Sequence, residues 1–514
     1  MRPMALALVA GLLQAVSIAA PWDGQAQWWL QLLSLAVLAW MTQRERDWKS
    51  AGLAGWTFAT AWLTGTFWWL FISMHVYGGL PSILAALAVV ALAAFLGAYY
   101  GVACAIFKKL EPSSGWAGAL LFASLWTLAE LGRVVWFTGF PWGSGGYAHL
   151  EGPLSSLAPY VGVHGIGFAA ALLAFGLSLL LREGTLRSWR YWLAIGGAAA
   201  GLAACNYAAR PAPTAGGQPR LSVALLQGNI PQDEKFEGGT GIPVALDWYG
   251  RQIQASTAQL VVAPETALPL LPHQLPEGYL DALRTRFSNG QQAALIGIPL
   301  GSLEQGYTNS VIGLKPGAGI YRFDKHHLVP FGEFIPPLFK WFTRMMNIPL
   351  GDFNRGPIGQ PTFDWHGQRL LPNICYEDLF GEELAARFTD PATAPTVFVN
   401  VSNIGWFGDS IAIDQHLQIS RMRSLEFQRP MIRATNTGAT VIIDHRGVVT
   451  HALPRLTRGV LTGEVEGRSA ITPYAWWVSR LGLWPLWLLG ALAVAAAAWR
   501  RRVNAQDASV PSPD

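Results

Sequence analysis

The chain has 514 residues, of which 51% are hydrophobic and 13% are charged. That charged share is about half the usual value for a soluble domain, so the composition excludes a wholly soluble protein. The net charge of +4 is too small to indicate nucleic acid as a partner. The 24 tryptophans agree with a membrane protein, because Trp favours the interface between bilayer and water.

Apolar segments long enough to cross a membrane recur along the chain, since a helical span needs about 17–25 residues. They cover residues 4–20, 26–43, 52–73, 80–107, 116–136, 161–181, 190–209 and 478–499. The first resembles a signal peptide, but the later spans make its removal unnecessary, and we expect a retained helix. The sequence therefore predicts seven transmembrane helices in residues 1–210 and an eighth in 478–502, followed by a polar cytoplasmic tail over 503–514.

Basic residues are confined to alternate loops between these segments, and cytoplasmic loops carry the excess of Lys and Arg. The clusters are Arg44, Arg46 and Lys49; Lys108 and Lys109; Arg182, Arg187 and Arg190; and Arg500, Arg501 and Arg502. The loops near 21–25, 74–79 and 137–160 contain no Lys or Arg. Counting crossings from a cytoplasmic N-terminus predicts that residues 211–477 lie on the opposite side of the membrane from the basic loops, in the periplasm if the cell has one.

The stretch from Arg210 to Arg220 is rich in Pro, Gly and Ala and is typical of a linker. Strand-length apolar runs follow, at 221–230, 258–265, 293–300, 370–377, 396–403 and 439–447. Helix-like stretches lie between several of them, at 244–259, 276–289 and 410–428. Alternating strands and helices predict a layered α/β domain over 211–477.

Two charged residues follow strand-like runs, where α/β folds usually place their sites. Glu265 comes after "VVAP" and can act as a general base if burial raises its pKa. A surface or helix-capping role would explain it equally well. Lys325, in "YRFDKHHLVPFGEF", can stabilise an oxyanion as a fixed positive charge. Taken alone, it could also be a solvated lysine.

Cys375 is the single cysteine of the predicted polar domain. Cys104 and Cys205 lie in apolar segments, where we expect core residues, so no disulfide can form within the domain. A free thiol outside the reducing cytoplasm risks oxidation, which favours a catalytic role over an inert buried thiol. A cysteine at a strand-to-helix turn, close to backbone N–H groups, suits acyl chemistry.

The adjacent His326 and His327 suggest a metal site, but no spaced Cys or carboxylate completes a ligand set around them. We therefore expect no metal here. The chemistry indicated by Cys375, Glu265 and Lys325 also requires no organic cofactor.

Together, Glu in "PET", Lys in "DKHHLVPFGEF" and Cys in "NICYED" resemble the Glu–Lys–Cys set of the nitrilase (carbon–nitrogen hydrolase) superfamily. The strings "LLQGNIPQDEKF", "YTNS", "NVSNIGWFGDS" and "RATNTGAT" extend the resemblance. It implies an α-β-β-α sandwich for the polar domain. The helices on either side, and the loop "FTGFPWGSGGY" (137–147), are similar to the apolipoprotein N-acyltransferase family of bacterial membrane enzymes.

The resemblance implies a role for each matching residue. Cys375 would be the nucleophile, Glu265 the general base and Lys325 the oxyanion stabiliser. Glu333, eight residues after Lys325, would orient or support that lysine.

Four further positions match the family less directly. Tyr376 and Glu377 would shape the turn of the nucleophile. Trp406 would lie in a mobile loop near the lipid or the peptide. Phe236 stands where the family often has Trp, which would keep an aromatic contact with acyl chains but lose the indole N–H.

The implied reaction moves a fatty acyl group from a membrane phospholipid, through a thioester on Cys375, to the α-amino group of the diacylglyceryl-modified N-terminal cysteine of an apolipoprotein. A membrane-tethered amidase that hydrolyses small amides would use the same residues, with water as the acceptor. A lipid transporter or scaffold with a degenerate enzyme domain is a third alternative. The few charges inside the predicted spans, Glu130 and Arg133, argue against transport.

Overall fold

The structure is a computed structural model that describes residues 2–180, 189–208, 219–335 and 353–507. Arg182, Arg187, most of the predicted linker and the end of the predicted tail lie outside the described residues.

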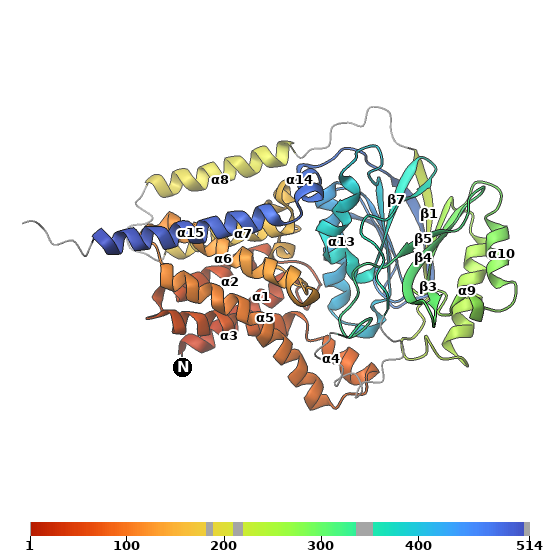
Figure 1. Cartoon of the computed structure of the whole chain (residues 1–514), viewed down its shortest axis with the longest axis horizontal. Helices are drawn as coiled ribbons and strands as arrows, with labels where there is room; N and C mark the ends of the chain where they lie inside the picture. Colours follow the sequence, from red (N-terminus) through yellow and green to blue (C-terminus); the bar gives the residue numbers. More distant parts are fainter. Residues whose placement is uncertain (1, 181–188, 209–218, 336–352, 508–514) are drawn as a thin grey trace, which may run out of the picture. The chain divides into compact units, whose positions relative to one another are not determined.

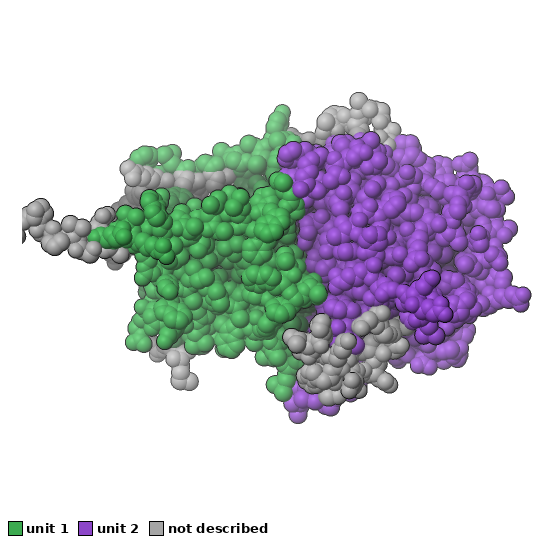
Figure 2. Space-filling model, viewed as in Figure 1, with its two compact units in different colours: residues 1–68, 86–211, 481–514 green, residues 69–85, 212–480 purple. Residues whose placement is uncertain are grey.

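The chain forms two compact units, coloured green and purple in Figure 2. The first contains Met1–Trp68, Ala86–Pro211 and Leu481–Asp514. The second contains Trp69–Ala85 and Ala212–Arg480. The second unit therefore includes a short segment from the N-terminal half, which the sequence patterns did not assign to it.

A helix lies at each of the eight predicted spans. These helices are α1 (Arg2–Ile18), α2 (Trp28–Arg44), α3 (Trp48–Thr66), α5 (Ser82–Leu110), α6 (Gly115–Val135), α7 (Ala158–Leu179), α8 (Trp189–Ala208) and α15 (Trp484–Asp507). Within the described ranges, three stretches are both long and apolar enough to cross a membrane: Ser82–Leu110, Gly115–Thr138 and Pro153–Leu179. The pair Pro473–Leu481 and Trp484–Asn504, bent by 83°, meets the same test together and would make a fourth.

Helices α3 and α5 approach closely through small residues, as helices in membranes commonly do. A Cβ added to Gly55 would lie 2.8 Å from the Cβ of Cys104, and one added to Gly101 would lie 3.0 Å from the Cβ of Trp56. Cys104 is buried, as expected, whereas Cys205 is only half-buried. Helix α3 ends at Thr66 instead of continuing to residue 73, and a separate turn, α4 (Leu70–Ile72), follows.

The second unit is built on two six-stranded sheets. The first sheet has the order β12 (Gly459–Glu466), β1 (Arg220–Gln227), β2 (Leu260–Ala263), β3 (Ala293–Ser302), β4 (Gly306–Leu314), β5 (Tyr321–Asp324). The second has the order β11 (Val449–Ala452), β10 (Val441–Ile443), β9 (Met431–Thr435), β8 (Val397–Ser402), β7 (Gln368–Ile374), β6 (Phe363–Trp365). Strands β1, β2 and β3 are parallel, and so are β7, β8 and β9.

Helices cover the outer faces of the two sheets (Figure 1). Helices α9 (Gly241–Ala255) and α10 (Tyr279–Arg286) pack on the first sheet, where Tyr249 and Ile253 of α9 share a buried core with Val261 and Ile296. Helix α13 (Ala412–Phe427) lies against the second sheet. The sheets face each other, with β1 touching β9 and β4 touching β7. This arrangement confirms the predicted α-β-β-α sandwich.

Candidate active site

Cys375 follows strand β7 and begins the 3₁₀ turn η8 (Cys375–Leu379). Its φ of 53° lies in the left-handed region, which non-glycine residues rarely adopt and which costs on the order of 1–3 kcal/mol. The carboxyl group of Glu377 stabilises the turn, because its Oε2 accepts a hydrogen bond of 2.7 Å from the N–H of Ile374. The strand end and this turn together hold the thiol at the carboxyl edge of the second sheet.

Glu265 lies just beyond β2, at the carboxyl edge of the first sheet, and is 7% exposed. Its Oε1 accepts hydrogen bonds from Asn309 Nδ2 at 2.6 Å and from Lys325 Nζ at 3.3 Å. Its Oε2 accepts one from the backbone N–H of Asn403 at 2.8 Å. Asn403 follows β8 of the second sheet, so Glu265 joins the two sheet edges.

Lys325 follows β5 and is completely buried. Its Nζ lies 2.8 Å from Glu333 Oε1 and 3.3 Å from Glu265 Oε1. Asn309 Nδ2 also donates to Glu333 Oε1, at 2.7 Å, so one amide and one ammonium bridge both carboxylates. The two ion pairs and the amide of Asn309 therefore hold the Lys325 ammonium in position.

The Glu265–Lys325 pair is ionised. Burial alone would raise the pKa of Glu265, but the charge of Lys325 and the hydrogen bond from Asn309 hold it below its ordinary value. Burial alone would lower the pKa of Lys325, but the charges of Glu265 and Glu333 outweigh it and raise that pKa. The expectation that burial would raise the pKa of Glu265 is therefore wrong, because Lys325 and Asn309 outweigh burial, and the site holds an ionised carboxylate beside a permanent cation.

The thiol itself is held in its protonated form. Burial, assisted by the charge of Glu265, raises the pKa of Cys375 to about 12, although the charge of Lys325 opposes this. A raised acid pKa means that almost no thiolate exists near neutral pH. Near neutral pH the Cys375 side chain is therefore a thiol, and the charges of Glu265 and Lys325 act on its pKa in opposite directions.

This thiol pKa predicts how Cys375 alkylation depends on pH. Below the pKa the thiolate fraction rises about tenfold per pH unit, and the thiolate is the reactive form. We expect the iodoacetamide rate of Cys375, followed by intact mass, to rise without a plateau from pH 7 to pH 10. The Cys375→Ala variant provides the background. A plateau near pH 8 would contradict a thiol held in its protonated form.

Gly297 in β3 lets the Glu265 loop approach the sheet. A Cβ at this position would clash with the carbonyl oxygen of Pro264 and lie 2.8 Å from the Cα of Glu265. We expect Gly297→Ala to displace Glu265 and slow acyl transfer about tenfold, with a lower thermal midpoint by tryptophan fluorescence. Gly238→Ala is the matched control, because a Cβ there meets no atom within 4 Å. Equal activity of the two variants would contradict the packing argument.

Glu377 also connects the cysteine turn to the lysine segment. Its Oε1 accepts hydrogen bonds from the N–H groups of His326 at 2.6 Å and His327 at 3.3 Å, directly after Lys325. Burial raises the pKa of Glu377 to about 8, while the N–H groups of Ile374 and His326 oppose the shift. A single side chain therefore sets the spacing between the nucleophile and the lysine.

The other predicted residues lie around this centre. Tyr376 is buried, and its ring centroid lies 5.7 Å from that of His327. Trp406 is half-buried in the turn η10 (Ile404–Phe407), which follows Asn403, and its ring lies 5.9 Å from that of Tyr77. Phe236 is half-buried beside Lys235, whose Nζ lies 5.9 Å from its ring centroid.

Several residues of the site were not singled out from the sequence. Lys235 is 2% exposed and donates to the backbone carbonyl of Glu265 at 3.1 Å, and burial lowers its pKa to about 7. Asn309 and Asn403 lie in the strings "YTNS" and "NVSN", which indicated the family but not these roles. His416 was given no role at all. The only available signal was the family strings that contain Asn309 and Asn403, because burial and hydrogen-bond partners are not visible in the sequence.

The histidine pair has partners within the protein. His326 Nδ1 lies 2.6 Å from the carbonyl of Gly356, and His327 Nδ1 lies 2.9 Å from Glu383 Oε1. Among the residues that the structure describes, no three His, Cys, Asp or Glu side chains converge as metal ligands.

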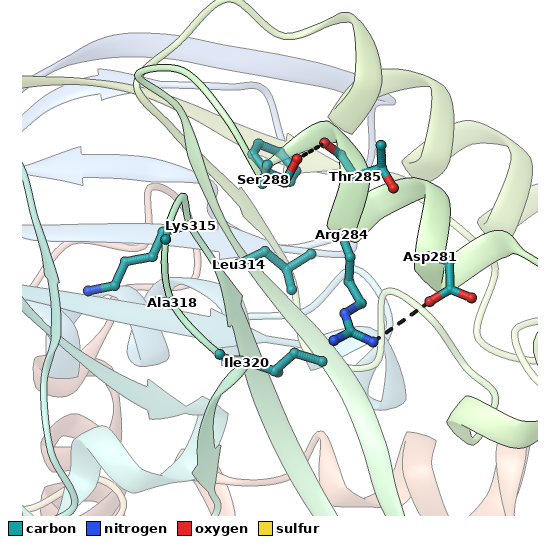
Figure 3. A pocket seen from close by; sticks show the side chains of 11 residues that line it. Asp281, Arg284, Thr285, Ser288, Leu314, Lys315, Ala318 and Ile320 are labelled. Atoms are coloured by element: carbon teal, nitrogen blue, oxygen red, sulfur yellow. Dashed lines mark hydrogen bonds and ion pairs between the residues drawn. The ribbon is translucent and has the colours of Figure 1, made fainter.

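A surface hollow of about 450 Å³ lies between α10 and the turn joining β4 and β5. Figure 3 shows Asp281 and Arg284 of α10, a surface ion pair, on one side of it and Lys315 and Ile320 on the other. None of the candidate catalytic residues lines it.

Comparisons with known proteins cover most of the chain. Residues 10–176 match the family described as "Apolipoprotein N-acyltransferase N-terminal domain", and residues 222–473 match "Carbon-nitrogen hydrolase". The chain is 61% identical to an apolipoprotein N-acyltransferase from Verminephrobacter eiseniae, over 93% of this chain and 92% of the relative. It is 46% identical to the one from Ralstonia nicotianae, over 92% of this chain and 90% of the relative. An amidase structure from Nesterenkonia sp. aligns over 53% of this chain and 97% of its own, with 16% identity and a TM-score of 0.36.

Proposed function

Because this chain belongs to the apolipoprotein N-acyltransferase family, we propose that Cys375 carries a fatty acyl group as a thioester between two lipid substrates. The observation that supports this most is the buried ion pair of Glu265 and Lys325, with the partly buried Glu333 2.8 Å from the same ammonium, because the charges of this set act on the Cys375 thiol. A base, a cation and a nucleophile so arranged are what acyl transfer requires.

In the first half-reaction, the sulfur of Cys375 attacks the ester carbonyl carbon of a phospholipid while its proton passes to Glu265. The carbonyl oxygen of the ester becomes an oxyanion, which Lys325 stabilises by its charge. Collapse of the tetrahedral intermediate breaks the bond to the glycerol oxygen, which takes the proton from Glu265. A lysophospholipid leaves, and the acyl group remains on Cys375.

In the second half-reaction, the free α-amino group of a diacylglyceryl-modified N-terminal cysteine attacks the thioester carbonyl. Glu265 accepts a proton from the attacking nitrogen, and Lys325 again faces the oxyanion. The carbon–sulfur bond breaks, Cys375 recovers its proton, and the N-acylated lipoprotein leaves. The cycle is a ping-pong reaction that consumes no nucleotide.

The remaining predicted residues have supporting roles in this proposal. Glu333 holds Lys325 in place, and Tyr376 and Glu377 maintain the turn of the nucleophile. Trp406 lies in a loop next to the lipid or peptide substrate. Phe236 offers an aromatic surface to acyl chains.

We also propose that all eight helices span the bacterial inner membrane, with residues 211–477 as the catalytic domain in the periplasm. The alternation of loops with and without Lys or Arg supports this orientation. Both proposed substrates are membrane lipids, and the helical unit would keep the catalytic domain beside them.

The test is intact mass of the purified full chain after incubation with phospholipid vesicles alone. We expect a gain of one fatty acyl mass that hydroxylamine removes and that the Cys375→Ala variant does not show. Transfer of that acyl group to a synthetic diacylglyceryl-cysteine peptide should then restore the original mass. An unmodified wild-type mass under these conditions would refute the thioester.

The amidase alternative is tested in the same preparation. A membrane-tethered amidase would release ammonia from small amides without lipid. The family membership favours the acyltransferase, and release of ammonia with no lipid-derived mass would reverse that conclusion.

A further inference from the structure

A buried charged network lies beneath the Cys375 turn, and the mechanism above does not use it. It consists of Asp378 in the turn η8, His416 and Ser420 on α13, and Arg433 on β9. All four side chains have 0% exposure. Charged groups this deeply buried are costly unless they are fully paired, so their arrangement calls for an explanation.

The hydrogen bonds determine which nitrogen of His416 carries its proton. Arg433 Nη2 lies 2.7 Å from His416 Nδ1, and a guanidinium can only donate, so Nδ1 is the acceptor. The proton is therefore on Nε2. This N–H lies 3.0 Å from Asp378 Oδ1 and 3.2 Å from the backbone carbonyl oxygen of Cys375, and both are acceptors.

The other members hold this imidazole in position. Asp378 Oδ2 accepts a hydrogen bond from Ser420 Oγ at 2.6 Å and lies 3.5 Å from Arg433 Nη1. Burial and the charge of Arg433 lower the pKa of His416, which keeps the ring neutral. Despite burial, the hydrogen bond from His416 and the charge of Arg433 keep the pKa of Asp378 low. One carboxylate and one guanidinium thus balance around a neutral ring.

The contact with Cys375 determines the direction of one peptide group. The peptide between Cys375 and Tyr376 is planar, so its C=O and N–H point in opposite directions. His416 Nε2 at 3.2 Å and Asn400 Nδ2 at 3.3 Å both donate to the C=O. Holding the carbonyl therefore also holds the Tyr376 N–H, next to a nucleophile whose backbone is in the left-handed region.

We propose that Asp378, His416 and Arg433 form a positioning network that holds the Cys375 carbonyl, so that the opposite N–H of Tyr376 stays aligned as a second donor to the oxyanion. This inference rests on the proposed acyl transfer. His416 acts through the peptide and does not touch the substrate.

The network predicts a selective defect. In His416→Leu the carbonyl loses a donor and the N–H is free to tilt, so acylation of Cys375 by phospholipid should slow about 10²-fold. The apparent affinity for phospholipid should stay unchanged. Alkylation of Cys375 by iodoacetamide forms no oxyanion, and its rate should remain within about twofold of wild type. His416→Gln keeps a side-chain N–H and should recover part of the acylation rate.

The matched control is Ser424→Ala, because Ser424 is also fully buried on α13, one helical turn beyond Ser420. It should acylate at the wild-type rate. If His416→Leu is acylated as fast as the wild type, the proposed positioning network is overturned. Loss of acylation combined with much faster alkylation would also overturn it, because this result would indicate general unfolding that exposes the thiol. Failure of the wild type to acylate would instead refute the proposed function.

Discussion

Replacement of Lys325 by Met should slow acylation of Cys375 on the order of 10³-fold, because the oxyanion loses its buried cation. The variant also leaves the carboxylates of Glu265 and Glu333 facing each other across Asn309, without the ammonium that lies 3.3 Å and 2.8 Å from them. One of the two should then take up a proton, since adjacent like charges raise a carboxyl pKa. Breaking a buried pair in this way should also cost about 3–5 kcal/mol of stability.

The Lys325→Met variant loses both oxyanion stabilisation and folding stability. A second substitution separates these two effects. Lys325→Met with Glu333→Gln removes one positive and one negative charge, so the local charge balance is restored. If the lysine stabilises the oxyanion, the double variant regains thermal stability but remains about as slow as Lys325→Met. Single-turnover acylation by intact mass and tryptophan fluorescence melting measure the two quantities. Acylation of Lys325→Met within about tenfold of wild type would contradict the role given to this residue.

Replacement of Glu265 by Gln should slow acylation by about 10²–10⁴-fold, the range expected for loss of a general base. The amide is similar in size but cannot accept a proton. The NH₂ group of the glutamine would also face a hydrogen-bond donor in either orientation. Asn309 and Lys325 donate to Oε1, and Asn403 donates to Oε2. The variant therefore loses the base and loosens the edge that joins the two sheets.

The same variant separates proton transfer from the supply of thiolate. The charge of Glu265 raises the pKa of Cys375, so its removal should lower that pKa and speed alkylation at pH 8. Faster alkylation combined with slower acylation would identify Glu265 as a base in the reaction. Glu265→Asp, which keeps the charge, should leave the alkylation profile near that of wild type. Parallel changes in both rates would argue for a purely electrostatic role.

Some features of this protein depend only on local sequence. The segments that became helices in the first unit were evident because hydrophobicity and the placement of Lys and Arg are properties of short stretches. Strands β1, β2, β3, β7 and β8 coincide with apolar runs for the same reason. Glu265, Lys325 and Cys375 were all found after strand-like runs, and the family motifs then indicated their roles.

Strand β4 shows why other parts were missed. Its first half, "YTNS", is polar and gives no apolar run, yet Asn309 and Ser310 are buried. Their partners are Glu265, Glu333 and Asp324, which come from other segments. A polar residue can be buried in a strand only when such partners are present, and sequence periodicity does not contain that information.

The active centre was therefore decided by tertiary structure. Lys325 and Glu265 are 60 residues apart, and Asn403 is 138 residues from Glu265, yet one carboxylate binds both. The low pKa of Glu265, the high pKa of Cys375 and the proton position on His416 all arise from such long-range contacts and from burial. The sequence alone determined which residues were available and which segments favour lipid. Folding decided their ionisation and geometry, because these depend on neighbours in space rather than neighbours in the chain.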